Sequence, residues 1–221
     1  MKIVVLTGAG ISAESGIPTF RDSNGLWNSF DAYDVASSRA MFHHPEKVIE
    51  FYNDRRRSMI GKKPNNAHLA LASLEKKHEV TIVTQNIDSL HEQAGSTNVI
   101  HVHGCINKAR NIETGEISFI GDKDLDPHGT YRPDVVLFGE YPRDNEALDA
   151  MYVCDLFIVI GTSGNVFPAA AYIDRVNMVG KSDTIEVNVT DTPITHKFNR
   201  VIRGEATKTV PKLVRELCRK I

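Results

Sequence analysis

Short apolar runs alternate with longer amphipathic segments along most of this chain. The runs are rich in β-branched residues and are mostly continuous, which is typical of strands buried on both faces. These predicted strands cover residues 3–6, 80–83, 99–102, 135–138, 156–160 and 184–187. Helical patterns fall between them at residues 45–60, 67–77, 145–152, 168–179 and 210–218. Strands that alternate with helices predict an α/β fold, in which helices cover both faces of a doubly wound, Rossmann-like parallel sheet.

Two stretches, 19–66 and 105–133, do not fit this alternation. We interpret them as two insertions that build a smaller second lobe. The first is helical, and the second contains a small hairpin around Thr114 and Gly115. The main domain then comprises residues 1–18, 67–104 and 134–221.

The composition describes a globular protein without a basic surface. Of 221 residues, 41% are apolar, and 26 basic against 28 acidic residues give a net charge of -2. This balance offers no footprint for nucleic acid or an anionic membrane, and no segment approaches the roughly 18 apolar residues of a membrane span. The three cysteines, Cys105, Cys154 and Cys218, are widely spaced and odd in number, which fits a reducing compartment. We expect a soluble, cytoplasmic monomer that binds neither nucleic acid nor membranes.

A glycine-rich segment follows the first predicted strand. Gly8, Gly10 and Gly16 stand where that strand gives way to a helix, so backbone amides there could approach a pyrophosphate. The third glycine comes six residues after the second instead of three, so a purely structural turn is the alternative. Phe20 and Arg21 follow, and they provide either an aromatic lid with a cation or an ordinary exposed loop with a buried ring.

Polar side chains gather where other predicted strands end. Gln85, Asn86 and Asp88 follow a buried strand, at the edge where open α/β sheets bind ligands, although Asp88 could instead cap a helix. Asn188 ends a later strand, where it either contacts a ribose or only stops the strand. His103 also follows a strand, and an unperturbed imidazole titrates near pH 6.5, which suits proton abstraction. A hydrogen-bonded core histidine is the alternative, and the neighbouring motifs favour catalysis.

The helical pattern at 45–60 carries a polar pair on an apolar stripe. Tyr52 and Arg55 lie three residues apart on the face that also holds Val48 and Met59. Arg55 could snorkel to solvent or pair with an acidic neighbour. Alternatively, the guanidinium and the phenol form a receptor for a carboxylate, which a guanidinium binds in a bidentate manner.

Five segments in this order resemble the motif set of the sirtuins, which are NAD-dependent protein deacylases. They are residues 8–12, 85–88, 103–104, 138–140 and 161–163. Tyr52 and Arg55 resemble the Tyr-x-x-Arg pair of the class III sirtuins, which prefer malonyl, succinyl or glutaryl lysine. The resemblance implies that NAD is consumed as a co-substrate and that the partners are acylated-lysine proteins or peptides.

The resemblance also implies roles for individual residues. His103 would be the general base, and Asn86 would position water or the ribose. The residues implied to bind NAD are Gly8, Ala9, Gly10, Ser12, Ala13, Glu14, Thr19, Phe20, Arg21, Trp27, Gln85, Asn86, Ile87, Asp88, Gly161, Thr162, Ser163, Asn188 and Ala206. The residues implied to bind the substrate are Tyr52, Arg55, Phe138, Gly139 and Glu140, of which the last three would pair with the extended substrate backbone by strand addition.

By resemblance, the reaction releases nicotinamide and moves an acetyl, succinyl or malonyl group from lysine to ADP-ribose. An NAD glycohydrolase or an ADP-ribosyltransferase could use the same site, and a non-catalytic NAD or ADP-ribose binding module is a further alternative.

The chain departs from the sirtuins in its metal ligands. Sirtuins carry a structural zinc held by two Cys-x-x-Cys pairs in the region that corresponds to 105–133, where this chain has only Cys105. Three cysteines cannot supply four thiolates, and the acidic residues between Asp122 and His128 are more typical of a charged turn than of a cation site. We therefore expect no bound zinc, and we expect Ile112, Ile117 and Phe119 to form the core of the small lobe instead.

Overall fold

The computed structural model describes residues 1–19, 31–164 and 169–219, and its larger part is built on a six-stranded parallel sheet. The strand order is β3-β2-β1-β7-β8-β9. The strands are β1 (Lys2–Thr7), β2 (Glu79–Thr84), β3 (Val99–His101), β7 (Leu156–Ile160), β8 (Asp183–Asn188) and β9 (Arg200–Arg203). This order confirms the predicted doubly wound α/β fold. It also places a topological switch point between β1 and β7, where folds of this class bind their ligands.

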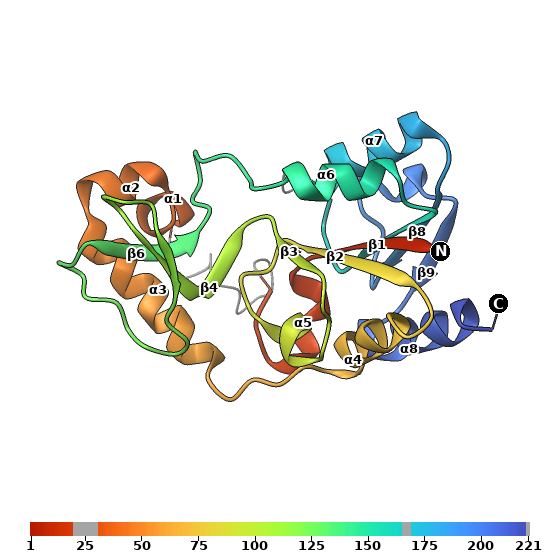
Figure 1. The fold of residues 1–221 in the computed structure, drawn as a ribbon, viewed down its shortest axis with the longest axis horizontal. Helices are drawn as coiled ribbons and strands as arrows, with labels where there is room; N and C mark the ends of the chain where they lie inside the picture. Colours follow the sequence, from red (N-terminus) through yellow and green to blue (C-terminus); the bar gives the residue numbers. More distant parts are fainter. Residues whose placement is uncertain (20–30, 165–168, 220–221) are drawn as a thin grey trace.

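Helices cover both faces of this sheet (Figure 1). On one face lie α4 (Asn66–Leu74) and α8 (Ala206–Leu217), and on the other lie α6 (Asn145–Tyr152) and α7 (Ala169–Val179). Side chains of β1 alternate between the two layers, because Ile3 and Val5 belong to the core that includes α4 and α8, whereas Val4 and Leu6 pack with α6 and α7.

Shorter elements connect the layers. They are the 3-10 helices η1 (Ala9–Ile11), η2 (Ala13–Ser15) and η4 (Thr195–Lys197) and the helix α5 (Leu90–Gln93). None of the helices in the described ranges combines the length and the apolar character needed to cross a bilayer.

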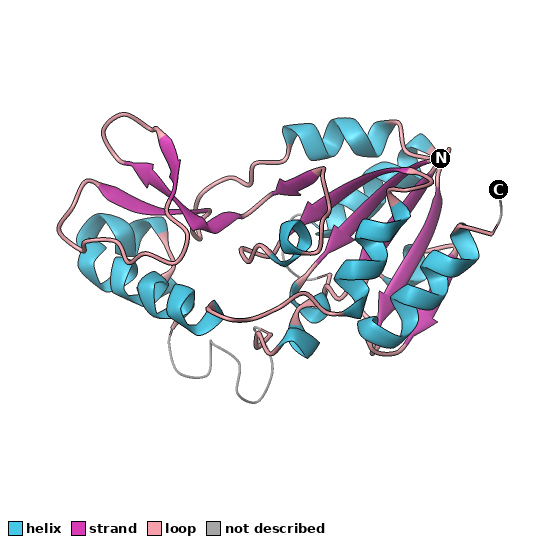
Figure 2. Ribbon diagram, turned by 60° about the horizontal axis from the view of Figure 1, so that its bottom comes forward, coloured by secondary structure: helices cyan, strands magenta, loops and turns pink. Residues whose placement is uncertain are grey.

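A smaller lobe extends from one end of the large sheet (Figure 2). Its three-stranded sheet has the order β5-β4-β6 and consists of β4 (Gly104–Asn111), β5 (Ile117–Phe119) and β6 (Tyr131–Val135). Its helices are α1 (Ala32–Val35), α2 (Ser38–His43) and α3 (Pro45–Met59). The antiparallel pairing of β4 with β5 confirms the hairpin around Thr114 and Gly115.

The strand predicted at 135–138 is wrong. The apolar run there belongs to the small lobe, because β6 ends at Val135 and pairs antiparallel with β4. Val135 and Leu137 are buried against Ile106 and Tyr52 in the core of that lobe. A continuous apolar run indicates burial, but it does not indicate in which sheet the burial occurs.

The predicted core of the small lobe is also wrong. Ile112, Ile117 and Phe119 are 56%, 45% and 77% exposed, because α3 covers the opposite face of the hairpin sheet. The core consists instead of residues from α3 and its neighbours, including Val48, Phe51, Tyr52, Ile106, Val135 and Leu137.

Two buried polar residues of α3 fasten it to the rest of the small lobe. The Asn53 carboxamide donates to the Leu125 carbonyl at 2.8 Å and accepts from the Leu125 amide at 2.9 Å. Arg56, which is 1% exposed, donates from Nε to the Ile106 carbonyl and from a terminal nitrogen to Asn53 Oδ1. These hydrogen bonds join α3 to β4 and to the segment that contains Leu125.

We predict that Asn53→Ala lowers the free energy of unfolding by about 2–4 kcal/mol, because it leaves the buried Leu125 groups and one Arg56 nitrogen without partners. Denaturant unfolding measures this loss. The control is Asn145→Ala, since Asn145 is exposed and should change the free energy by less than about 0.5 kcal/mol. Equal stability of the two variants would show that the hydrogen bonds of Asn53 do not hold the small lobe together.

Candidate active site at the carboxyl edge of the sheet

Two glycine-containing turns meet backbone to backbone at the switch point. The Gly8 amide donates to the Ile160 carbonyl at 3.0 Å, and the Gly10 amide donates to the Gly161 carbonyl at 2.9 Å. A Cβ added to Gly8 would lie 2.8 Å from the Gly161 oxygen, and one added to Gly10 would lie 2.7 Å from the Gly161 Cα. Neither turn can accept a side chain at these positions.

The unusual glycine spacing has a local cause. The segment after Gly10 forms the short helices η1 and η2 rather than one long helix. Gly16 ends η2 in the left-handed conformation, with a φ of 78°, which glycine adopts without steric cost. The third glycine therefore terminates a helical turn, while the first two allow the close approach to Gly161.

The polar cluster after β2 forms a hydrogen-bonded network with the glycine-rich segment. Asn86 Nδ2 donates to the Gly8 carbonyl and to Ser12 Oγ, each at 3.1 Å, and Ser12 Oγ donates to Asp88 Oδ2 at 3.0 Å. The other Asp88 oxygen accepts from the Leu90 amide, so Asp88 binds the first amide of α5 as well as the network. Burial raises the pKa of Asp88, and its hydrogen bonds from Leu90 and Ser12 oppose that shift.

A second chain of hydrogen bonds crosses the sheet edge. Thr162 Oγ1 donates to Gln85 Oε1 at 2.9 Å, and Asn188 Nδ2 donates to the Thr162 carbonyl at 2.7 Å. Residues from the ends of β2, β7 and β8 are thus joined in one row. The partly exposed residues Gly161 and Ser163 lie on the same turn.

Other residues with an implied NAD-binding role are placed as follows. Ala9 and Ala13 are partly exposed in the glycine-rich segment, and Thr19 is the last residue described before the gap. The Glu14 carboxylate accepts from the Thr207 amide at 3.0 Å, next to the buried Ala206 at the start of α8. The Ile87 carbonyl accepts from the Ile106 amide at 2.9 Å. The remaining three, Phe20, Arg21 and Trp27, lie outside the described residues.

His103 stands where the chain passes from the large sheet to the small one. Its Nδ1 lies 3.0 Å from the Gln85 carbonyl, which can only accept, so Nδ1 carries a proton and the lone pair of the neutral ring is at Nε2. Gly104 follows with a φ of 79°, and a Cβ there would lie 2.1 Å from the Asp134 carbonyl. This tight turn fixes the direction of the imidazole, and its tautomer is the one that a general base needs.

Tyr52 and Arg55 face the same region from α3. Tyr52 is 7% exposed, and burial raises the pKa of its hydroxyl, opposed by the charges of Arg55 and Arg132. Burial lowers the pKa of Arg55 to about 10, and the nearby Tyr52 and Asp88 oppose this shift. Within the described part of the chain, neither the Arg55 guanidinium nor the Tyr52 hydroxyl donates a hydrogen bond. The Arg55 guanidinium therefore lies near Tyr52 and Asp88, and neither of the two donors has an acceptor among the described residues.

The segment around Phe138 is tied to the helices of the small lobe. Its amide donates to the Ala36 carbonyl at 2.8 Å, and its carbonyl accepts from the Ser38 amide at 2.9 Å. Gly139 has a φ of 93°, and the Glu140 carboxylate binds Arg132 and the Leu137 amide. The backbone amide and carbonyl of Phe138 are therefore already paired with the helical part of the small lobe.

Three residues that support the end of β1 and the glycine-rich segment were not predicted from the sequence: Asn65, His68 and His91. Asn65 Nδ2 donates to the Ile11 carbonyl at 2.8 Å, and His91 Nε2 lies 3.0 Å from Thr7 Oγ1. The rings of His68 and His91 are in edge contact, and burial lowers the pKa of His68 to about 4. A histidine on the apolar face of a predicted helix was the only available signal, and that signal is typical of any core histidine.

The fold and this edge define a dinucleotide-binding α/β protein with a second lobe beside the site. The Sir2 family profile matches residues 8–168, and the chain belongs to the Sir2 family. It is 47% identical over 228 residues to the NAD-dependent protein deacylase SIR2rp3 of Leishmania major, with 96% of this chain and 93% of that protein covered. It is 44% identical to an NAD-dependent protein deacylase of Rhodopirellula baltica, with 97% and 98% covered.

Solved structures give the same assignment. A Sir2 homologue mutant in complex with ADP ribose superposes with a TM-score of 0.92 at 37% identity, covering 99% of this chain and 92% of that chain. A Sir2 homologue in complex with NAD superposes with a TM-score of 0.88 at 36% identity, covering 99% and 90%.

Proposed function

We propose that this Sir2-family protein is an NAD-dependent protein-lysine deacylase and that it favours acyl groups that end in a carboxylate. The single observation that carries the first part is the arrangement of His103 beside the network of Asn86, Ser12 and Asp88 at the glycine-lined switch point. The second part rests on Tyr52 and Arg55, two neighbouring donors on α3 that have no acceptor among the described residues.

The site suits NAD because the backbone of its glycine-containing turns lies at the carboxyl edge of the large sheet, where folds of this class bind ligands. Gly8, Gly10 and Gly161 let the two turns pack against each other, and the backbone amides at this edge could approach a pyrophosphate. Asn188 and the turn that contains Thr162 and Ser163 would hold the adenosine half. NAD, when bound, supplies a ribose carbon that loses nicotinamide and becomes the acceptor of the acyl oxygen.

Asn86, Asp88 and His103 have different roles in the proposed reaction. Asn86 and Asp88 orient the nicotinamide end, and their mutual hydrogen bonds with Ser12 keep them in place. His103 accepts a proton at Nε2 from a ribose hydroxyl, since its Nδ1 is committed to the Gln85 carbonyl. One water is consumed in releasing the lysine amine, and the products are nicotinamide, free lysine and O-acyl-ADP-ribose.

A structural zinc does not fit the residues of the small lobe. Cys105 is the only cysteine between residues 104 and 153, and no three His, Cys, Asp or Glu side chains of the described residues are grouped as metal ligands. No step of the proposed mechanism involves a metal.

We predict that His103→Ala lowers the rate of NAD-dependent deacylation by about 10²–10⁴-fold, because a positioned base contributes a rate factor of that size. Mass spectrometry of the products from NAD and acyl-lysine peptides measures it, with His128→Ala as the exposed control. Unchanged turnover would remove His103 from the mechanism. Release of free ADP-ribose by the wild type, without acyl transfer, would identify an NAD glycohydrolase instead.

We predict that Arg55→Met lowers activity on succinyl or malonyl lysine at least about tenfold more than on acetyl lysine, because only the former present an anion to the guanidinium. Arg57→Met is the matched control. Arg57 lies on the same helix but is exposed and binds Asp54 and Asp124. Equal losses on both substrates would mean that Arg55 supports the fold only.

We predict that the protein folds and turns over without zinc, because its donors cannot form a closed tetrahedral site. Elemental analysis of the purified protein should find no stoichiometric zinc, and a chelator should leave activity and unfolding temperature unchanged. One zinc per chain, or activity lost to the chelator and restored by zinc, would contradict this.

A further inference from the structure

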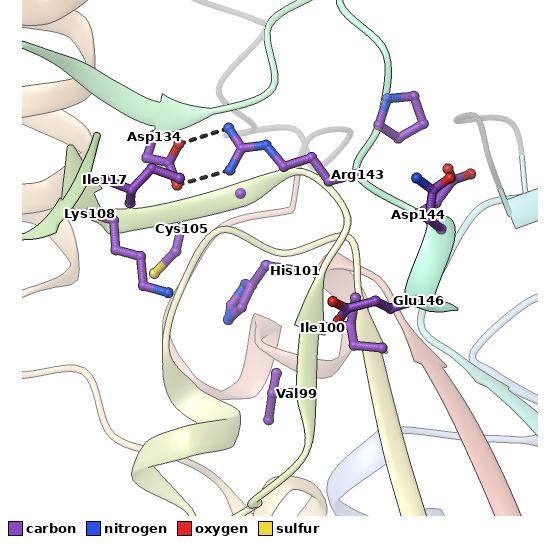
Figure 3. Close-up of a pocket in the computed structure, with 13 residues that line it drawn as sticks. Val99, Ile100, His101, Cys105, Lys108, Ile117, Asp134, Arg143, Asp144 and Glu146 are labelled. Atoms are coloured by element: carbon purple, nitrogen blue, oxygen red, sulfur yellow. Dashed lines mark hydrogen bonds and ion pairs between the residues drawn. The ribbon is translucent and has the colours of Figure 1, made fainter. Parts of the chain in front are cut away.

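His101, two residues before His103, contacts both ends of the segment of residues 86–92, which follows β2. Its side chain is 10% exposed, its Nδ1 lies 3.1 Å from the Asn86 carbonyl, and its Nε2 lies 2.7 Å from Glu92 Oε1. Figure 3 shows its ring in the wall of a cavity of about 560 Å³, which Cys105 and Lys108 of β4 also line. This cavity lies beside the free edge of β3, outside the row of residues that would bind NAD.

Both nitrogens of His101 face acceptors. A carbonyl oxygen and a carboxylate can only accept hydrogen bonds, and one ring nitrogen of His101 lies within hydrogen-bond distance of each. Burial raises the pKa of Glu92, but the hydrogen bond and charge of His101 outweigh burial and hold that pKa below its ordinary value. The pair therefore forms a hydrogen-bonded bridge between β3 and α5.

The contact of His101 with Asn86 is one of three successive hydrogen bonds that hold the backbone after β2. Three successive carbonyls, those of Gln85, Asn86 and Ile87, accept from His103 Nδ1, His101 Nδ1 and the Ile106 amide. Among the described residues, no backbone amide donates to the Asn86 carbonyl, so His101 is its hydrogen-bond donor. A shift of this carbonyl would also move the Asn86 Cα, from which the side chain reaches Gly8 and Ser12.

We propose that His101 and Glu92 are positioning residues that hold Asn86 and Asp88 in the geometry needed for breaking the nicotinamide bond. Neither residue contacts the place of the reacting atoms. Both act through the backbone of residues 86–92, with His101 at one end of this segment and Glu92 at the other. This inference rests on the proposed function for its kinetic consequence, but its structural consequence can be measured without turnover.

The first test compares His101→Leu with His101→Asn. Leucine removes both donors, whereas the asparagine amide nitrogen can take the place of Nδ1. We expect His101→Leu to lower kcat and nicotinamide exchange in parallel by about 10–100-fold, with a nearly unchanged KM for NAD, because small misplacements affect the chemical step most. His101→Asn should recover most of the rate. The control is His128→Leu, at an exposed histidine.

Glu92→Ala and Glu92→Gln form a second pair, which also serves if His101→Leu does not fold. Glutamine still accepts from Nε2, so we expect Glu92→Gln to retain more of kcat than Glu92→Ala. Full kcat in both His101→Leu and Glu92→Ala would overturn the proposal. A loss confined to the KM for NAD, or no rescue by either conservative variant, would also overturn it, since a merely structural role predicts no such rescue.

Amide hydrogen exchange separates this proposal from the proposed function. The amides of residues 86–88 should exchange faster in His101→Leu than in the wild type and should be protected again in His101→Asn. Unchanged exchange in His101→Leu would refute the positioning role even if deacylation is confirmed. If the wild-type protein is inactive but the two variants show the expected exchange pattern, the deacylase assignment is refuted and the positioning role of His101 stands.

Discussion

The contact between two backbone turns at the switch point determines how the rest of the site is arranged. Gly8 and Gly10 lie so close to Gly161 that no Cβ can be inserted between them. This contact brings the end of β1 against the end of β7 and leaves the carbonyl of Gly8 facing Asn86. The close approach therefore fixes the floor of the site, and the polar side chains from β2 and β8 are arranged around it. A larger residue at either turn would separate segments that are far apart in the sequence.

Much of the main domain could be predicted because its signals are local. Buried parallel strands produce continuous apolar runs, and the carboxyl ends of such strands meet at one edge. That rule is sufficient to group Gly8, Gln85, Asn188 and Gly161 from the sequence alone. The apolar run at 135–138 was wrongly assigned to the large sheet, because apolar residues are also buried in the core of the small lobe. The edge strand β9, with exposed residues such as Arg200 and Val201, has no comparable pattern.

The contacts that could not be predicted are long-range and depend on single atoms. Asn53 and Leu125 are 72 residues apart, and the bond between them has no counterpart in hydrophobic periodicity. The bridge from His101 to Asn86 and Glu92 is equally invisible, because a strand-end histidine has many possible partners. Whether Arg55 has an internal acceptor also depends on the whole surroundings of α3. The residue types in the site follow from the motifs, but their hydrogen-bond partners follow only from the three-dimensional fold.

The bond from Glu14 to Thr207 spans 193 positions of the sequence. It joins the glycine-rich segment, which is made early during synthesis, to the first turn of α8, which is made late. β1 likewise pairs with β7, on the far side of the small lobe in the sequence. A ribosome-bound chain that has not yet released these later segments cannot hold its glycine turns in place. The site should therefore form only after β7 and the first turn of α8 have left the ribosome.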